Sequence, residues 1–123
     1  MKKYILLSLF LSFVIVACNK TSITNDPKED ARNMTEQLVK AAENNDIVAA
    51  DEIMGKYYEA YSKKDLADKV VFIQNVHDCE AFNKSDVWDD FTQSDEFKNS
   101  ANNKRFEIFY RETREEAKRL GVW

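Results

Sequence analysis

The chain has 123 residues, of which 44% are hydrophobic, and a formal net charge of −4 at pH 7. This length allows one small domain with a modest hydrophobic core. The acidic balance argues against a nucleic-acid-binding surface, which needs a basic face, and against broad electrostatic adsorption to anionic lipid. With two cysteines, two glycines and one proline, the composition favours an all-helical domain without a disulfide framework.

The first element in chain order combines a positive start with an apolar run. Met1-Lys2-Lys3 precedes an uncharged stretch over 4–17, which is the pattern of a secretory signal. As a helix, the apolar part would be about 20 Å long, against about 30 Å for the hydrocarbon core of a bilayer. We therefore expect residues 1–17 to be a cleaved signal peptide rather than a permanent membrane span.

This segment closes with Ile15-Val16-Ala17-Cys18, which resembles the lipobox of bacterial lipoproteins. The resemblance implies that diacylglycerol is attached to the Cys18 thiol and that a peptidase cuts before it. Several acyl chains would then hold the protein stably to a membrane. Asn19, in place of the Asp linked to inner-membrane retention, favours the outer membrane, facing the periplasm. The alternative is an ordinary cleaved signal that happens to contain a cysteine.

Residues 18–26 are polar and nearly free of core-forming side chains, which predicts a flexible, lipidated tether. The helical domain is then expected over 27–123. Asp26 is predicted to cap the first helix, with Pro27 in its first position. A second helix is expected after the break at Asn44-Asn45-Asp46, so that the two form a hairpin.

A third helix is predicted over 66–81, where two apolar stripes cover more than half of the circumference. His77 and Cys79 lie on these stripes, and we expect both to pack in the core. A zinc site needs three or four convergent ligands, and His77 is the sole histidine. No metal or cofactor is therefore expected. Four central positions of the helical stripes are predicted to be buried: Leu38, Ile53, Val70 and Ile73.

Two further helical elements are predicted before the C-terminus. Ser85 can cap a short element, and Ser94 can start a long helical segment to 120 that bends or breaks near Asn102-Asn103. Gly121 suits a C-terminal cap, after which residues 122–123 fold back. The long helix is expected to place Phe97, Ala101 and Ile108 on one apolar side and Phe106, Phe109, Thr113, Ala117 and Leu120 on another. The expected architecture is a small bundle of four to five helices.

Acidic and aromatic side chains alternate in the short element, where Asp86, Asp89 and Asp90 flank Trp88 and Phe91. As core, the aromatic pair would be a lid on the bundle; exposed, it would be a contact surface for a protein partner. The carboxylates could also serve a glycosidase mechanism, but their spacing has no signature and a sugar cleft is needed. An EF-hand reading fails because the glycine and alternating oxygen ligands are missing.

These features favour a lipid-anchored envelope protein that binds another envelope protein and carries out no catalysis. The first alternative is an inhibitor or immunity-type protein whose acidic patch docks into the basic cleft of an exported hydrolase. The second is a small envelope hydrolase that uses the carboxylates of Asp86, Asp89 and Asp90. An enzyme needs a pocket with convergent polar groups, whereas a binding protein needs an exposed apolar patch.

Overall fold

The computed structural model describes residues 23–123, so the predicted signal peptide and Cys18 lie outside the described residues. Over this range the chain is all-helical, which confirms the predicted fold class. The four long helices are α2 (Pro27–Glu43), α3 (Ile47–Tyr61), α4 (Leu66–His77) and α8 (Ala101–Arg119). Between α4 and α8 the chain forms three short helices, α5 (Glu80–Lys84), α6 (Trp88–Gln93) and α7 (Asp95–Lys98).

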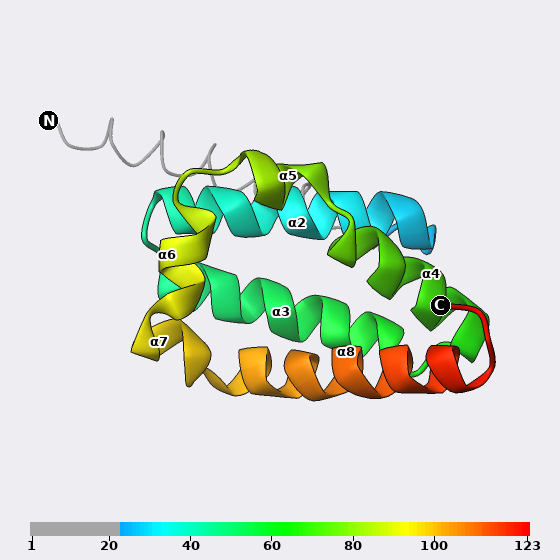
Figure 1. The fold of residues 1–123 in the computed structure, drawn as a ribbon. Helices are drawn as coiled ribbons and strands as arrows, with labels where there is room; N and C mark the ends of the chain where they lie inside the picture. The colour runs from blue at the N-terminus through cyan, green and yellow to red at the C-terminus, as the bar shows by residue number, and fades with distance from the viewer. Residues whose placement is uncertain (1–22) are drawn as a thin grey trace, which may run out of the picture.

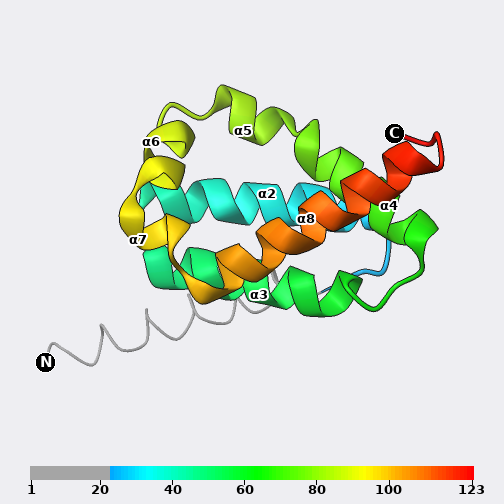
Figure 2. The same cartoon turned by 60° about the horizontal axis from the view of Figure 1, so that its bottom comes forward.

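The long helices form a four-membered bundle. The helices α2 and α3 form a hairpin. α4 packs against α2, and α8 packs against both α3 and α4 (Figures 1 and 2). The short helices α5, α6 and α7 form a lid that contacts α2 and α3 and closes the end where α2 turns into α3 (Figure 1). We call this the lid end. The opposite end, which we call the tether end, holds the start of α2, the α3–α4 connection and the end of α8 (Figure 1).

The centre of the bundle is a stack of aromatic rings. The ring of Phe72 lies 4.1 Å from that of Tyr61 and 6.2 Å from that of Tyr57, and all three residues are fully buried. Phe106 of α8 meets Phe72 edge-on. Such ring pairs stabilise the fold beyond the contribution that comes from burying the rings. The core therefore joins α3, α4 and α8 through large side chains, while α2 contributes smaller ones.

Three of the four predicted central core positions are buried, namely Leu38, Val70 and Ile73. Ile53 is only partly buried at the edge of the core, so that prediction was wrong. The reason is the phase of α3, where Met54 and the residues one turn before and after it occupy the inner face.

A buried carboxylate connects α2 to α3 and to the start of the described chain. Asp30 is fully buried, and its Oδ2 accepts a hydrogen bond of 2.5 Å from the Tyr61 hydroxyl. Its Oδ1 accepts from the backbone N–H and the hydroxyl of Thr24, and its Oδ2 also accepts from the N–H of Asn25. These donors offset the cost of removing a carboxylate from water. Residues 24 and 25, at the end of the predicted tether, are thus bound to the domain.

Aspartate caps open the first three helices. Asp26 accepts from the N–H of Lys28 at 3.1 Å, and Pro27 occupies the first position of α2, as predicted. Asp46 caps α3 and Asp65 caps α4 in the same way. Because a side-chain oxygen satisfies an unpaired N–H at each start, the three helices begin where the sequence indicates.

The predicted third helix is too long at its C-terminal end. It stops at His77, and the chain turns at Asp78 and Cys79 before α5 begins at Glu80. The Cys79 sulfur accepts a hydrogen bond from the N–H of Ala81 at 3.2 Å and so caps α5. The turn moves the following residues off α4 and onto α2, which is why the second apolar stripe does not continue along one helix.

The predicted long helix after Ser94 is also interrupted. Ser94 caps a helix start as predicted, and the predicted bend or break is a break. It lies at Asn99 and Ser100 rather than at Asn102-Asn103, because Asn102 is already inside α8. Both residues at the break donate hydrogen bonds to backbone carbonyls of α7. The Asn99 side-chain amide donates to the carbonyl of Asp95, and the Ser100 hydroxyl donates to the carbonyl of Phe97. Such local bonds compete with continuation of a helix.

Only one of the two predicted apolar sides of α8 is buried. Phe106, Phe109, Thr113 and Ala117 face the core. Ala101, Ile108 and Leu120 are exposed, which contradicts the prediction for these three residues. After Leu120, Gly121 adopts φ +77° and the N–H of Val122 bonds to the carbonyl of Ala117. This is the predicted glycine cap, and it turns the chain end back onto the bundle.

Candidate interaction surfaces

The predicted acidic and aromatic element forms the lid, with its aromatic side chains turned inward. Phe91 and Phe97 are buried, and Trp88 is partly buried and stacks on Phe82 with 4.3 Å between ring centres. The reading of this element as part of the core is therefore confirmed. Phe91 cannot contact a partner as predicted, because its ring is enclosed by Trp88 and Phe97.

The carboxylates of the lid remain on its outer surface. Asp86, Asp89 and Asp90 are exposed, and the last two lie in the first turn of α6, where they complement the helix dipole. They do not line either of the two grooves described below. Their geometry thus supports contact with a partner's surface rather than chemistry inside a cleft.

His77 and Cys79 were both predicted to pack in the core, and the structure separates them. His77 is exposed; its Nδ1 lies 3.0 Å from Asp78, and its ring contacts those of Tyr110 and Trp123. The core prediction was wrong for His77 because the helix ends there, beyond the buried turn. Cys79 is partly buried, and its thiol donates to the hydroxyl of Thr35 at 2.9 Å.

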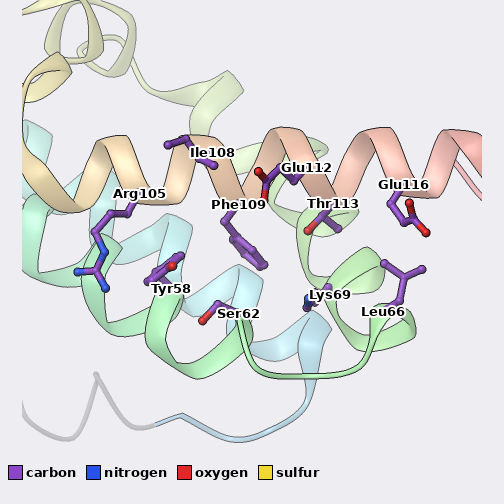
Figure 3. A pocket seen from close by; sticks show the side chains of 10 residues that line it. All are labelled: Tyr58, Ser62, Leu66, Lys69, Arg105, Ile108, Phe109, Glu112, Thr113 and Glu116. Atoms are coloured by element: carbon purple, nitrogen blue, oxygen red, sulfur yellow. The ribbon is translucent and has the colours of Figure 1, made fainter.

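A groove opens on the side of the bundle between α8 and the α3–α4 corner (Figure 3). We call it the α8 groove; its volume is about 280 Å³. Phe109 points from α8 towards Tyr58 of α3, and their rings meet edge-on at 5.9 Å (Figure 3). The lining consists of Tyr58, Ser62, Leu66, Lys69, Arg105, Ile108, Phe109, Glu112, Thr113 and Glu116.

Charged side chains of both signs border the α8 groove. At its lid end, the guanidinium of Arg105 lies 4.5 Å from the centre of the Tyr58 ring and donates to Glu59 at 2.8 Å. Towards the tether end, Lys69 comes from α4, whereas Glu112 and Glu116 come from α8 (Figure 3). An aromatic floor is therefore flanked by fixed charges, a combination that suits an amphipathic peptide segment.

The helices α3 and α8 approach each other closely at Gly55, next to Arg105 at the border of this groove. At Gly55, an added Cβ would lie 2.6 Å from Nδ2 of Asn102, so no larger residue fits without movement. Asn102 is held in place because its N–H and its side-chain amide donate to Asp51 of α3. Its Oδ1 accepts from Arg105, which fixes the arginine at the border of the groove.

A second groove, of about 570 Å³, lies between α2 and the turn from α4 to α5. Its charged residues satisfy one another: Arg32 pairs with Glu29 and Glu36, and Lys84 with Glu80. Exposed pairs of this kind contribute little free energy, and Arg105 and Glu116 of the α8 groove are paired in the same way. What distinguishes the α8 groove is the aromatic floor of Tyr58 and Phe109. We therefore regard the α8 groove, with its aromatic floor, as the better candidate site.

Sequence patterns did not reveal the α8 groove. Apolar periodicity in α3 does not distinguish Tyr58 at the groove from its buried neighbour Tyr57, and nothing in the pattern singles out Arg105. The one available signal was the second apolar side of α8, because Ile108 belongs to a stripe that the bundle leaves exposed at 45%.

Comparison with known proteins gives no family: no family model, curated protein or solved structure matches this chain. Over residues 23–123, no group of three or more His, Cys, Asp or Glu side chains is arranged to hold a metal ion. Within the same range, no helix is both long and apolar enough to cross a bilayer. The functional interpretation therefore depends on the surfaces described above and on the N-terminal sequence.

Proposed function

We propose that the chain is a bacterial envelope lipoprotein, anchored through Cys18, that binds another protein through the α8 groove. The observation that carries the binding proposal is the groove itself, an open aromatic floor with charges of both signs along its borders. The domain would lie on the periplasmic face of the outer membrane. In this proposal its role is binding, without a catalytic step.

The anchor is supported by the lipobox-like Ile15-Val16-Ala17-Cys18 after a positive start and an apolar run. The test is incorporation of labelled fatty acid in a bacterial host. Wild type is expected to incorporate the label and partition into detergent, and Cys18→Ser to lose both properties. Cys79→Ser is the matched control, since serine can replace the sulfur as the cap of α5. A wild-type protein without label would contradict the anchor.

A protein partner fits the α8 groove better than a small molecule does. Its volume of about 280 Å³ is just below the lower end of typical ligand pockets. The floor is a strip along α8 rather than an enclosed chamber, because Phe109 and Thr113 lie one helical turn apart on it (Figure 3). A segment with an apolar side chain between charged residues could place that side chain against Tyr58 and pair its charges with the borders.

The binding proposal is tested by crosslinked capture from intact envelopes with two matched variants. Ile108→Glu adds a charge at the edge of the groove, whereas Val48→Glu adds the same charge at an exposed position on α3, outside it. We expect Ile108→Glu to lose a partner that wild type and Val48→Glu both retain. Equal capture by all three proteins, with unchanged helical content, would contradict binding at this groove.

One observation favours an inhibitor or immunity-type protein as the second candidate function. The segment 86–96 carries five acidic residues and no Lys or Arg, and Asp86, Asp89 and Asp90 are exposed on the lid. Such a surface could dock into a basic cleft of an exported hydrolase. Substituting these three aspartates with asparagine should then slow association and reduce its dependence on salt. In that case, Ile108→Glu should leave binding unchanged, which separates the two candidates.

A further inference from the structure

The chain enters the bundle at a fixed place on the tether end. Thr24 and Asn25 are bound to the buried Asp30, as described above. Asn25 also accepts a hydrogen bond of 2.9 Å from Nζ of Lys64, in the α3–α4 connection. Ile23 packs against the core. The first described residues are therefore bound to the domain, with Asn25 held at the tether end.

The length of the preceding chain limits the distance of this end from the lipid. If Cys18 carries the lipid, as the proposed function requires, only residues 19–22 separate it from Ile23. Fully extended, the connection spans less than about 20 Å. The helix α2 alone is about 25 Å long. The tether end must therefore stay close to the bilayer surface, whereas the lid end can project away from it.

The two ends differ in the charges that they present. Near the tether end, exposed charges of both signs are mixed: Lys63 lies 3.7 Å from Glu59, and Lys118 follows Glu115 and Glu116 on α8. At the lid end, the segment 86–96 is acidic and contains no basic residue. An anionic bilayer therefore repels the acidic lid segment more than the mixed tether end. The net negative charge still means that the lipid, not the charge, provides the affinity.

Apolar side chains are exposed at the same end. Leu120 and Val122 are 50% and 55% exposed, on either side of the glycine turn that follows α8. Exposing apolar side chains to water is unfavourable. Apolar side chains next to lysines are typical of surfaces that lie at the boundary between lipid headgroups and acyl chains. Held within about 20 Å of the bilayer by the connection, these side chains are close to that boundary.

The geometry points to the tether end as a lipid-facing surface, which rests on the proposed lipidation of Cys18. Lys63 and Lys118 contact the phosphates of the headgroups, and Leu120 and Val122 enter the interfacial layer. The bundle therefore stands on the membrane with its acidic lid directed into the compartment, and the α8 groove opens along its side. The lipid attaches the protein to the membrane, and this surface sets the orientation of the domain on it.

The test uses the full lipidated chain in vesicles of phosphatidylcholine and phosphatidylglycerol. A bimane fluorophore is attached at Ala67→Cys, near the tether end, or at Val48→Cys, near the lid end, both in a Cys79→Ser background. Both positions are exposed and lie in the first turn of a helix. A lipid with a nitroxide on its headgroup quenches bimane at short range. We expect loss of fluorescence at position 67 and unchanged fluorescence at position 48.

Charge reversal then shows whether the named lysines hold this orientation. Lys63→Glu with Lys118→Glu should reduce quenching at position 67 and raise it at position 48. Lys40→Glu with Lys98→Glu makes the same change of charge near the lid end, where both lysines are exposed, and should leave both signals unchanged. Equal quenching at 67 and 48 in wild type, in protein that carries fatty acid and floats with vesicles, would overturn the inference. Failure to incorporate fatty acid or to float would instead contradict the proposed anchor.

Discussion

The long-helix bundle and the lid are stabilised in different ways. In the bundle, Tyr57, Tyr61 and Phe72 are fully buried between long helices, and a buried carboxylate is paired with a tyrosine hydroxyl. In the lid, an aromatic cluster of Phe82, Trp88, Phe91 and Phe97 packs on helices of only four to six residues. Helices this short are not stable alone, so the lid depends on its aromatic contacts and on side-chain caps.

This difference indicates how each region opens. Loss of a bundle contact affects helices that all share one core, so the molecule should unfold as a unit. Loss of a lid contact affects a segment of short helices that packs on α2, α3 and the start of α8 from one end, so the lid can open locally while the bundle persists. The predictions below test this distinction, in order of decreasing effect.

The largest expected effect is that of Phe72→Ala, because it removes the ring at the centre of the aromatic stack. We expect a loss of about 3–5 kcal/mol in the free energy of unfolding, measured by urea denaturation. Phe91→Ala removes an equally large and buried side chain from the lid and is the matched comparison.

For Phe91→Ala we expect a smaller loss of global stability and faster amide exchange confined to residues 80–98. The reason is that local opening of the lid limits how much its packing contributes to the whole fold. If the two substitutions cost the same and exchange rises uniformly, the lid is an integral part of the bundle and the distinction is wrong.

Removing the hydroxyl at the buried carboxylate is expected to have an intermediate effect. Tyr61→Phe leaves Asp30 with the donors of Thr24 and Asn25 only, so we expect a loss of about 1.5–3 kcal/mol, as for hydrogen bonds to charged groups. Thermal denaturation at neutral pH measures this. An unchanged melting temperature would show that the bond contributes nothing net to the bundle.

The same residue predicts a loss of stability in alkali. Burial, and then the bond to Asp30, raise the pKa of Tyr61 in the folded state. Unfolded tyrosine ionises near pH 10, so the contribution of Tyr61 is complete below about pH 10 and falls by about 1.4 kcal/mol per pH unit above it. Denaturation at pH 9 to 11 should show a shallower decline for Tyr61→Phe than for wild type. Burial also raises the pKa of Tyr57, so some decline should remain.

The smallest effect concerns a cap in the lid. The Ser94 hydroxyl accepts a hydrogen bond from the N–H of Phe97 at 3.3 Å, and Ser94→Ala should cost about 1 kcal/mol or less. Ser100 stands at the start of α8 without a side-chain bond of this kind and is the matched control. Ser100→Ala should therefore change stability less than Ser94→Ala. The reverse order in paired melts would contradict the role of caps in holding the lid.

The long helices could be predicted from the sequence because periodicity and caps agree in them. Asp26 and Pro27 give the start of α2, and Leu38 and Ile73 mark faces that are buried. Where two apolar stripes run together, periodicity does not show where one helix ends. The turn at Cys79 therefore escaped prediction, because it depends on contact with Thr35, distant in sequence.

The candidate site was less predictable than the fold. A stripe of apolar residues shows that one side of a helix is apolar but not whether another helix covers it, and in α8 Ile108 is left exposed. The α8 groove combines residues of α3, α4 and α8, and the bond from Asn102 to Asp51, which joins α8 to α3 beside it, spans distant parts of the chain. The role of Asp30 was hidden for the same reason, since a carboxylate in a first turn usually only complements the helix dipole.

The link from Asp30 to the start of the chain has a mechanical consequence. In a lipid-anchored protein, any pull of a bound partner against the membrane passes through Ile23 and Thr24 into the domain. The hydrogen bonds of Thr24 and Asn25 to Asp30 transfer that load to α2, and Tyr61 passes it on to α3. Force therefore reaches the middle of the bundle through several bonds at once rather than peeling α2 from its first turn. The position of this carboxylate would thus let several bonds share a pull on the start of the domain.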